Sequence, residues 1–221
     1  TPEYEILYQK AFSNNNSNKF DFIFEVSSHS ISKKRISNFP INIAALTNIT
    51  QDHLDFHRTI NNYKKTKLKL FLNHLEKGGI AILNDEISGI NTLKKKLLKK
   101  DIKIITYGNK KSDIYIYQSK LNHIIKIHNK KYSCKLRDYC KFEITNLACS
   151  IACNISLGLS ISTILKAIPK IKKPIGRFQI VGKLNNNAKI LVDYAHTPDA
   201  LKNILIVNTF KKIKPNIIFG C

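Results

Sequence analysis

Apolar positions in the first half of the chain alternate between strand-like runs and helix-like periods. Residues 41–49 are almost continuously apolar, which is typical of a strand buried on both faces. Apolar residues over 60–75 instead recur every three or four positions, which predicts a helix. The same reasoning predicts further strands at 20–27, 80–83 and 102–107 and a second helix at 86–100. Strands that alternate with helices predict an α/β fold, with a mostly parallel sheet and flanking helices.

The pattern changes in the second half of the chain. Short alternating runs between 113 and 135 predict antiparallel hairpins. Residues 142–168 predict a pair of helices, and the prolines that follow are typical of a linker. Beyond them the pattern predicts strands at 177–184, 189–193 and 216–220 and a helix at 198–211. The predicted domains are 1–174, the C-terminal part of one domain, and 175–221, the start of a second α/β domain.

The stretch 145–165 carries no charge and is long enough to span a bilayer. Asparagines, serines and threonines interrupt it, however, and Gly158 followed by Ser160 is typical of one helix ending and another beginning. We therefore predict two packed helices and no membrane span.

Composition adds two observations. The sequence has 221 residues, contains no Met and ends on an apolar run, so we expect a piece of a longer protein. Lys and Arg number 37 against 15 Asp and Glu, a net charge of +22, which would suit a nucleic-acid-binding domain. The lysines are scattered, however, and no Trp is present to form a platform for base stacking. We favour solubilising lysines, or steering of an anionic small substrate.

The five cysteines do not form a recognisable pattern. Their number is odd, no Cys-x-x-Cys pair occurs, and Cys149 and Cys153 lie four apart on an apolar helix face. We expect core thiols in a reducing cytoplasm, with neither a disulfide framework nor a zinc site.

Three predicted strands end in polar clusters, at 25–29, 47–55 and 193–199. Ligands of open parallel sheets collect at the carboxyl ends of strands, so a shared site is one interpretation. Helix caps and hydrogen-bonded core histidines are the alternative for each cluster taken alone.

On a 3.6-residue period the first predicted helix has an apolar face made of Ile60, Tyr63, Leu70 and Phe71. Lys67 lies in the middle of this face. Such a lysine either extends its amine to water or has a function, since burial favours a neutral, nucleophilic amine that can react with CO₂. Periodicity alone leaves both open.

These residues resemble the Mur ligase family. The segments Glu25-Val-Ser-Ser-His29, Thr47-Asn48, Asp52-His53-Leu54-Asp55 with His57, and Tyr63-x-x-x-Lys67-x-x-x-Phe71 resemble its central ATPase domain. Gly176-Arg177 and the run from Asp193 to Leu201 resemble the start of its C-terminal domain. Within the family the motifs are most similar to the MurE type, the tripeptide synthetases.

The resemblance implies an ATP-dependent amide ligase of peptidoglycan synthesis. ATP would phosphorylate the D-glutamyl carboxylate of UDP-N-acetylmuramoyl-L-alanyl-D-glutamate. The amine of a diamino acid, meso-diaminopimelate in preference to L-lysine, would then attack the acyl phosphate. Mg²⁺ is implied as the cofactor, since phosphoryl transfer depends on positioning and cationic stabilisation. A cytoplasmic monomer without a nucleic-acid partner is expected.

The resemblance also assigns roles to matching positions. Lys67 would carry a carbamate, which turns a cation into an oxygen ligand suited to Mg²⁺. The implied metal ligands are Glu25, His53 and Lys67, and the implied catalytic residues are Lys67, His53 and Arg177. The implied substrate-binding residues are Thr1, Ser27, Lys33 and Arg35, with Lys33 standing where the family commonly has Gln. The implied ATP-binding residues are Asn146, Arg177, Asp193 and His196.

The sequence contains no Gly-x-x-Gly-Lys-Thr phosphate loop, so we expect the chain by itself not to turn over ATP. The segment that selects the amino acid in the family is also absent, which leaves diaminopimelate or lysine undecided. Three alternatives remain: another Mur or folylpolyglutamate-type ligase, a basic nucleic-acid-binding fragment without catalysis, or the product of a decayed gene.

Overall fold

The computed structural model describes residues 3–12, 21–50, 53–120, 122–136, 139–206 and 215–220. Contacts divide the chain into two compact units, Thr1–Ser112 and Asp113–Cys221, which are treated separately below. This division falls earlier than the predicted boundary after residue 174, which stays a prediction about the family's domains.

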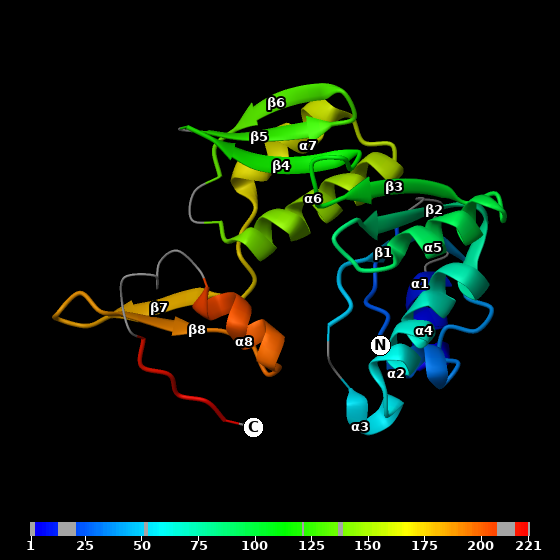
Figure 1. The fold of residues 1–221 in the computed structure, drawn as a ribbon, viewed down its shortest axis with the longest axis horizontal. Coiled ribbons are helices and arrows are strands. Elements are labelled where there is room, and N and C mark those ends of the chain that lie inside the picture. The colour runs from blue at the N-terminus through cyan, green and yellow to red at the C-terminus, as the bar shows by residue number, and fades with distance from the viewer. Residues whose placement is uncertain are drawn as a thin grey trace. The chain divides into compact units, whose positions relative to one another are not determined.

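The first unit contains three parallel strands connected through helices (Figure 1). The strands are β1 (Ile41–Leu46), β2 (Leu75–Asn84) and β3 (Lys103–Tyr107). The helices are α1 (Tyr4–Phe12), α2 (Ser28–Ser32), α3 (Leu54–His57), α4 (Ile60–Lys69), the π-helical turn η1 (Leu70–His74) and α5 (Ile90–Leu98). Parallel strands require such crossover connections, and these bring all three carboxyl ends to one edge.

Helix α5 illustrates how the pattern of apolar residues builds the core of this unit. Ile90, Leu93 and Leu97 recur on one face and are buried, and they belong to the same cluster as Leu83 of β2. Leu98, the next residue, points away from the cluster and is 67% exposed. A single helical face therefore anchors α5.

The second unit combines antiparallel strands with helices. Its elements are β4 (Ile114–Ser119), β5 (Asn122–Ile127), β6 (Lys130–Cys134), α6 (Lys141–Ser156), α7 (Ile161–Ala167), the 3₁₀ turn η2 (Ile168–Lys170), β7 (Gln179–Lys183), β8 (Lys189–Val192) and α8 (Pro198–Leu205). Alternate residues of β4 and β5 are buried, and α6 packs against β4. The pair β7–β8 forms a separate hairpin, drawn in orange shades in Figure 1.

Most predicted elements are confirmed. The strands at 41–49, 80–83 and 102–107, the hairpins at 113–135 and the helix pair at 142–168 all appear with shifted ends. The α/β class is confirmed as well. In the described part of the chain, no helix has the length and apolarity needed to cross a membrane. Cysteines 134, 140, 149 and 153 form no disulfide.

Two predicted strands are wrong. Residues 21–27 alternate as expected, with Phe22, Phe24 and Val26 packed on the core, but they pair with no strand among the described residues. Residues 215–220 are exposed and have no regular structure, since an apolar run forms a strand only against a neighbour. The predicted helix at 198–211 begins as expected and is seen to Leu205; positions 207–211 lie outside the described residues.

Two neighbouring leucines test the packing of α5. We expect Leu97→Ala to lower the free energy of unfolding by about 2–5 kcal/mol, because it leaves a cavity at a fully buried position. Leu98→Ala is the matched control, and its free energy of unfolding should stay within about 0.5 kcal/mol of the wild-type value. Urea titration followed by far-UV circular dichroism measures both. Equal losses in the two variants would contradict the orientation of α5.

Candidate functional site

Lys67 reaches from α4 to the carboxyl end of β1. Helix α4 begins at Ile60, and the Thr59 hydroxyl before it accepts a hydrogen bond from the Asn62 amide at 3.2 Å. The Lys67 Nζ donates to the carbonyl of Asn48 at 3.3 Å and lies 4.8 Å from the centre of the Tyr63 ring. The helix thus directs this amine toward the backbone that follows β1.

The apolar face predicted around Lys67 is largely confirmed. Tyr63, Leu70 and Phe71 are buried, and Lys67 itself is half-buried. Ile60 does not belong to this face, because it lies in the first turn of α4 and is 42% exposed.

Three histidines gather beside Tyr63 and form what we call the histidine cluster: His29, His53 and His57. The rings of His29 and His53 lie 4.7 Å apart, and those of His29 and His57 lie 5.8 Å apart, between centres. The Tyr63 ring lies 6.4 Å from His53 and 5.3 Å from His57. Because Lys67 stands on the same ring, Tyr63 connects the predicted residues Lys67 and His53.

Short helices hold the histidine cluster in place. His53 precedes α3 in a left-handed conformation with φ of 51°, which turns the chain into that helix. His57 at the end of α3 is buried, and its Nε2 shares a hydrogen bond of 2.9 Å with the hydroxyl of Ser28. Helix α2, which carries Ser28 and His29, packs against α4.

The other predicted residues of this unit flank α2. Ser27 caps its start by accepting from the Ser30 amide at 3.2 Å, and Lys33 closes its other end as an exposed residue. Glu25 lies on the outward side of the alternating segment 21–27. Arg35 forms an ion pair with Glu3 at 2.5 Å. Thr1 lies outside the described residues.

Side chains from β2 and β3 bind the end of β1. The Asn84 amide nitrogen donates to the carbonyl of Thr47 at 2.8 Å, and its oxygen accepts from the Glu86 amide at 2.9 Å. The Tyr107 hydroxyl donates to the carbonyl of Leu46 at 2.9 Å. Asn84 and Tyr107 are both buried and face each other in the register of β2 and β3.

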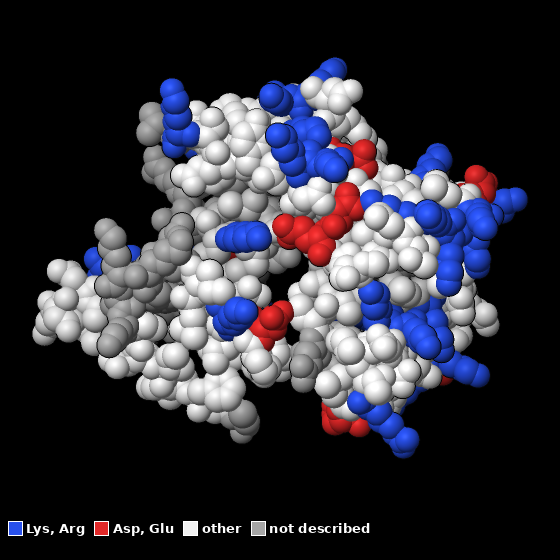
Figure 2. Space-filling model, viewed as in Figure 1, with Lys and Arg blue, Asp and Glu red and all other residues white. Residues whose placement is uncertain are grey.

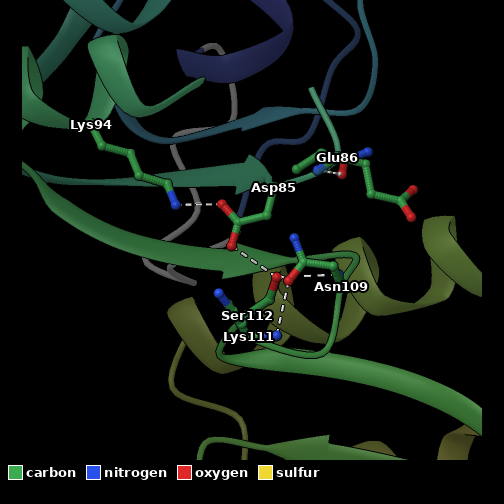
Figure 3. A network of polar contacts seen from close by, with 7 residues as sticks. Asp85, Glu86, Lys94, Asn109, Lys111 and Ser112 are labelled. Carbon is green, nitrogen blue, oxygen red and sulfur yellow. Dashed lines mark hydrogen bonds and ion pairs between the residues drawn. The ribbon is translucent and has the colours of Figure 1, made fainter. Parts of the chain in front are cut away.

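A second polar network lies directly after these strands (Figure 3). Asp85 accepts from the Lys94 ammonium and, at 2.9 Å, from the Ser112 hydroxyl. The Ser112 hydroxyl in turn accepts from the Asn109 amide at 3.2 Å, and the Asn109 side chain accepts from the Lys111 amide. The network ties the turn after β2 to the turn after β3.

In the second unit, Asp193 organises the predicted nucleotide residues. Its carboxylate accepts from the amides of Phe178 at 2.7 Å and Ala195 at 2.8 Å, which joins the end of β8 to the chain before β7. The Arg177 guanidinium lies 4.7 Å from the centre of the Tyr194 ring, a cation–π contact.

His196 and Asn146 complete this group. The Nδ1 of His196 lies 3.0 Å from the carbonyl of Tyr194, and the two rings are 5.1 Å apart. Asn146 is exposed on α6, one turn after Phe142, whose ring lies 6.3 Å from that of Phe178. Arg177, Asp193 and His196 are therefore brought together around one hairpin.

Lysines gather elsewhere on the surface. Figure 2 shows them over the face formed by α4 and α5. A cavity of about 330 Å³ between these helices is bordered by Lys64, Lys65 and Lys96 over a floor that includes Leu68. None of the predicted site residues lines this cavity.

Residues 1–154 match the model of the Mur ligase middle domain. The chain belongs to the Mur ligase family. A UDP-N-acetylmuramoyl-L-alanyl-D-glutamate–2,6-diaminopimelate ligase of Rickettsia conorii is 36% identical in an alignment of 209 residues that covers 90% of this chain and 42% of that protein. The chain thus spans less than half the length of this curated relative.

Solved structures agree with the family. A UDP-N-acetylmuramoyl-L-alanyl-D-glutamate–2,6-diaminopimelate ligase superposes with a TM-score of 0.65 at 27% identity, over 82% of this chain and 38% of that one. The MurF ligase of Thermotoga maritima, in complex with ADP, superposes with a TM-score of 0.63 at 19% identity, over 91% and 52% of the two chains. The second likeness concerns the fold alone.

For this Mur ligase chain, sequence reasoning missed Asn84 and Tyr107. One signal was present, because each is a polar side chain at the end of a strand that is otherwise apolar. Their hydrogen bonds cross 37 and 61 residues of sequence, and no local pattern reports such contacts.

The environment of His57 favours its neutral form. Burial lowers the pKa of His57 below the ordinary value, and repulsion from His29 and His53 lowers it further. Asp55 opposes this shift with a smaller effect. A neutral His57 can keep its hydrogen bond to Ser28 in one defined tautomer.

We expect His57 to titrate below about 6.5, the value in an unfolded chain. Because the folded pKa is the lower one, its contribution to stability is fully present above that pH and is lost as the pH falls through the folded pKa. Proton NMR titration gives the pKa of His57, and urea unfolding of wild type and His57→Gln gives the linked stability. The variant should lose less stability on acidification. A His57 pKa at or above 6.5 would contradict this account.

Proposed function

We propose that this chain is part of an ATP-dependent ligase that adds a diamino acid to UDP-N-acetylmuramoyl-L-alanyl-D-glutamate. The observation that carries the proposal is the position of Lys67 and His53 on one aromatic ring at the carboxyl end of β1. Two of the relatives named above are 2,6-diaminopimelate ligases, which supports that amino acid over lysine. Cytoplasmic location and a monomeric state are part of the proposal.

The reaction joins two anionic substrates in two steps. The γ-phosphoryl group of ATP forms a bond to a D-glutamyl carboxylate oxygen while its bond to the β-phosphate oxygen breaks, and ADP leaves. The neutral amine of the diamino acid then attacks the acyl carbon. Phosphate leaves, and the amine nitrogen loses a proton. Positioning and charge stabilisation supply most of the catalysis in such phosphoryl transfer.

We propose that carbamylation of Lys67 creates a magnesium site from side chains that do not form one by themselves. In the described part of the chain, no group of three or more His, Cys, Asp or Glu side chains is arranged to hold a metal. A carbamate on Lys67 would add oxygen donors, and the imidazole of His53 and the exposed carboxylate of Glu25 would be the other proposed ligands; Mg²⁺ prefers hard oxygen ligands. When bound, the ion neutralises charge on the transferring phosphates.

Charged and polar residues of each unit have distinct proposed roles. Arg177, Asp193, His196 and Asn146 would contact the nucleotide, with Arg177 held against Tyr194 so that its guanidinium is already oriented. Ser27, Lys33 and Arg35, together with Thr1, would contact the UDP-muramoyl dipeptide. Arg35 is half-buried and is paired with Glu3, so its proposed substrate contact requires it to exchange that ion pair for a substrate carboxylate.

A ligase assay tests the proposed function. The complete gene product that contains these 221 residues is supplied with ATP, Mg²⁺ and the UDP-muramoyl dipeptide, and with either meso-diaminopimelate or L-lysine. We expect ADP release and formation of the UDP-tripeptide, seen by mass spectrometry, with diaminopimelate preferred. ADP release that depends on neither the amino acid nor the UDP-muramoyl dipeptide would contradict the proposal.

In the same assay Lys67→Ala should lower turnover by about 100-fold or more, because it removes the ligand that completes the metal site. Added acetate should restore part of the activity by placing a carboxylate in the vacated space. Lys69→Ala is the control, since Lys69 is exposed on the same helix and should retain wild-type turnover. Full activity of Lys67→Ala would end the assignment.

A further inference from the structure

The hydrogen bonds of the sheet end before they reach the residues that bind Lys67. The last paired residue of β1 is Leu46, opposite Leu83 of β2. Asn48, whose carbonyl accepts from the Lys67 Nζ, lies two residues further on and belongs to no strand. Something other than the ladder has to fix the position of this carbonyl.

Two buried side chains hold the two residues that come directly before Asn48. The Asn84 amide binds the carbonyl of Thr47 at 2.8 Å, and the Tyr107 hydroxyl binds that of Leu46 at 2.9 Å. Asn84 is 5% exposed and Tyr107 is fully buried, so water competes little for either bond. We call Asn84 and Tyr107 the strand-end clamp.

A glycine makes room for the strand-end clamp. Gly108 follows Tyr107 with φ of +115°, a backbone conformation that residues with a side chain rarely adopt. A Cβ at this position would lie 2.7 Å from the Asn84 side-chain oxygen. The same oxygen accepts from the Glu86 amide at 2.9 Å, which orients the amide group so that its nitrogen faces Thr47.

We infer that Asn84 and Tyr107 are positioning residues for Lys67: by holding Leu46 and Thr47 they fix the Asn48 carbonyl that orients the Lys67 nitrogen. An ammonium has three N–H donors and a carbamate nitrogen keeps one, so the same carbonyl can accept from Lys67 in both states. With that N–H directed to Asn48, the carbamate oxygens point elsewhere. The hydrogen bonds described above support the placement of the Lys67 nitrogen, whereas the importance of that placement for catalysis rests on the proposed function.

Lysine labelling tests the placement without any substrate. The wild-type chain, Asn84→Asp and Tyr107→Phe are treated with a small amine-acetylating reagent in CO₂-depleted buffer, and each modified lysine is located by fragmentation mass spectrometry. Asp lacks the amide donor and Phe lacks only the hydroxyl. We expect Lys67 to be acetylated about 2- to 10-fold faster in both variants, the change that accompanies loss of one net hydrogen bond.

Lys64 is the internal control. It lies on the same helix, and its ammonium also donates to a main-chain carbonyl, that of Ser88, which the strand-end clamp does not touch. The acetylation rate of Lys64 should stay unchanged in both variants. A general loss of structure would instead raise the acetylation rates of Lys64 and Lys67 together. Tyr117→Phe, a hydroxyl deletion on β4, should change neither. An unchanged Lys67 rate, or equal increases at Lys64 and Lys67, would overturn the inference.

The ligase assay separates this inference from the proposed function. If both hold, Tyr107→Phe lowers kcat severalfold while KM for ATP stays near the wild-type value, because Tyr107 is fully buried beneath the site. A wild-type protein without ligase activity would refute the proposed function and leave the labelling result intact. Selective labelling changes with unchanged kcat would refute the catalytic part of the inference.

Discussion

The hydrogen bonds that Asn84 and Tyr107 make to the end of β1 determine the geometry of the region around Lys67. A parallel ladder aligns strands but leaves the residues after each strand unpaired with the sheet. Here side chains of the next two strands bind the carbonyls of Leu46, the last paired residue, and of Thr47, the first residue beyond the pairing, across 61 and 37 residues of sequence. The Lys67 contact with Asn48 begins where these bonds end. The position of Lys67 thus depends on three strands and one helix together.

Electrostatics suits this geometry to anionic ligands. The chain carries a net charge of +22, yet the histidine cluster is arranged to keep His57 neutral through burial and through its histidine neighbours. The Lys67 amine lies against the Tyr63 ring, which also borders the histidine cluster, and donates to the carbonyl of Asn48. A cationic surface can attract phosphates and carboxylates, while the neutral, buried His57 keeps its hydrogen bond to Ser28.

Local patterns predicted the elements of this fold well, and contacts between distant segments explain what they missed. The apolar run of β1 was enough to predict a buried strand, and the amphipathic period of α5 was enough to predict a helix. Segment 21–27 has the alternation of a strand, and its inward side chains do pack on the core, but alternation does not reveal whether a partner strand exists. Periodicity placed Lys67 on an apolar helix face, and the resemblance to the Mur ligases implied a functional role for it together with His53. Neither contained information about Asn84 or Tyr107, whose roles arise only when three strands align.

The proposed ligase depends on one chemical state of Lys67, its carbamate. Carbon-13 NMR of the protein in ¹³C-bicarbonate with Mg²⁺ detects this state directly, with Lys67→Ala and Lys69→Ala as a matched pair. The account predicts a carbamate resonance in the wild type and in Lys69→Ala that disappears in Lys67→Ala. A resonance of equal size in Lys67→Ala, or none in the wild type at saturating bicarbonate, would contradict it.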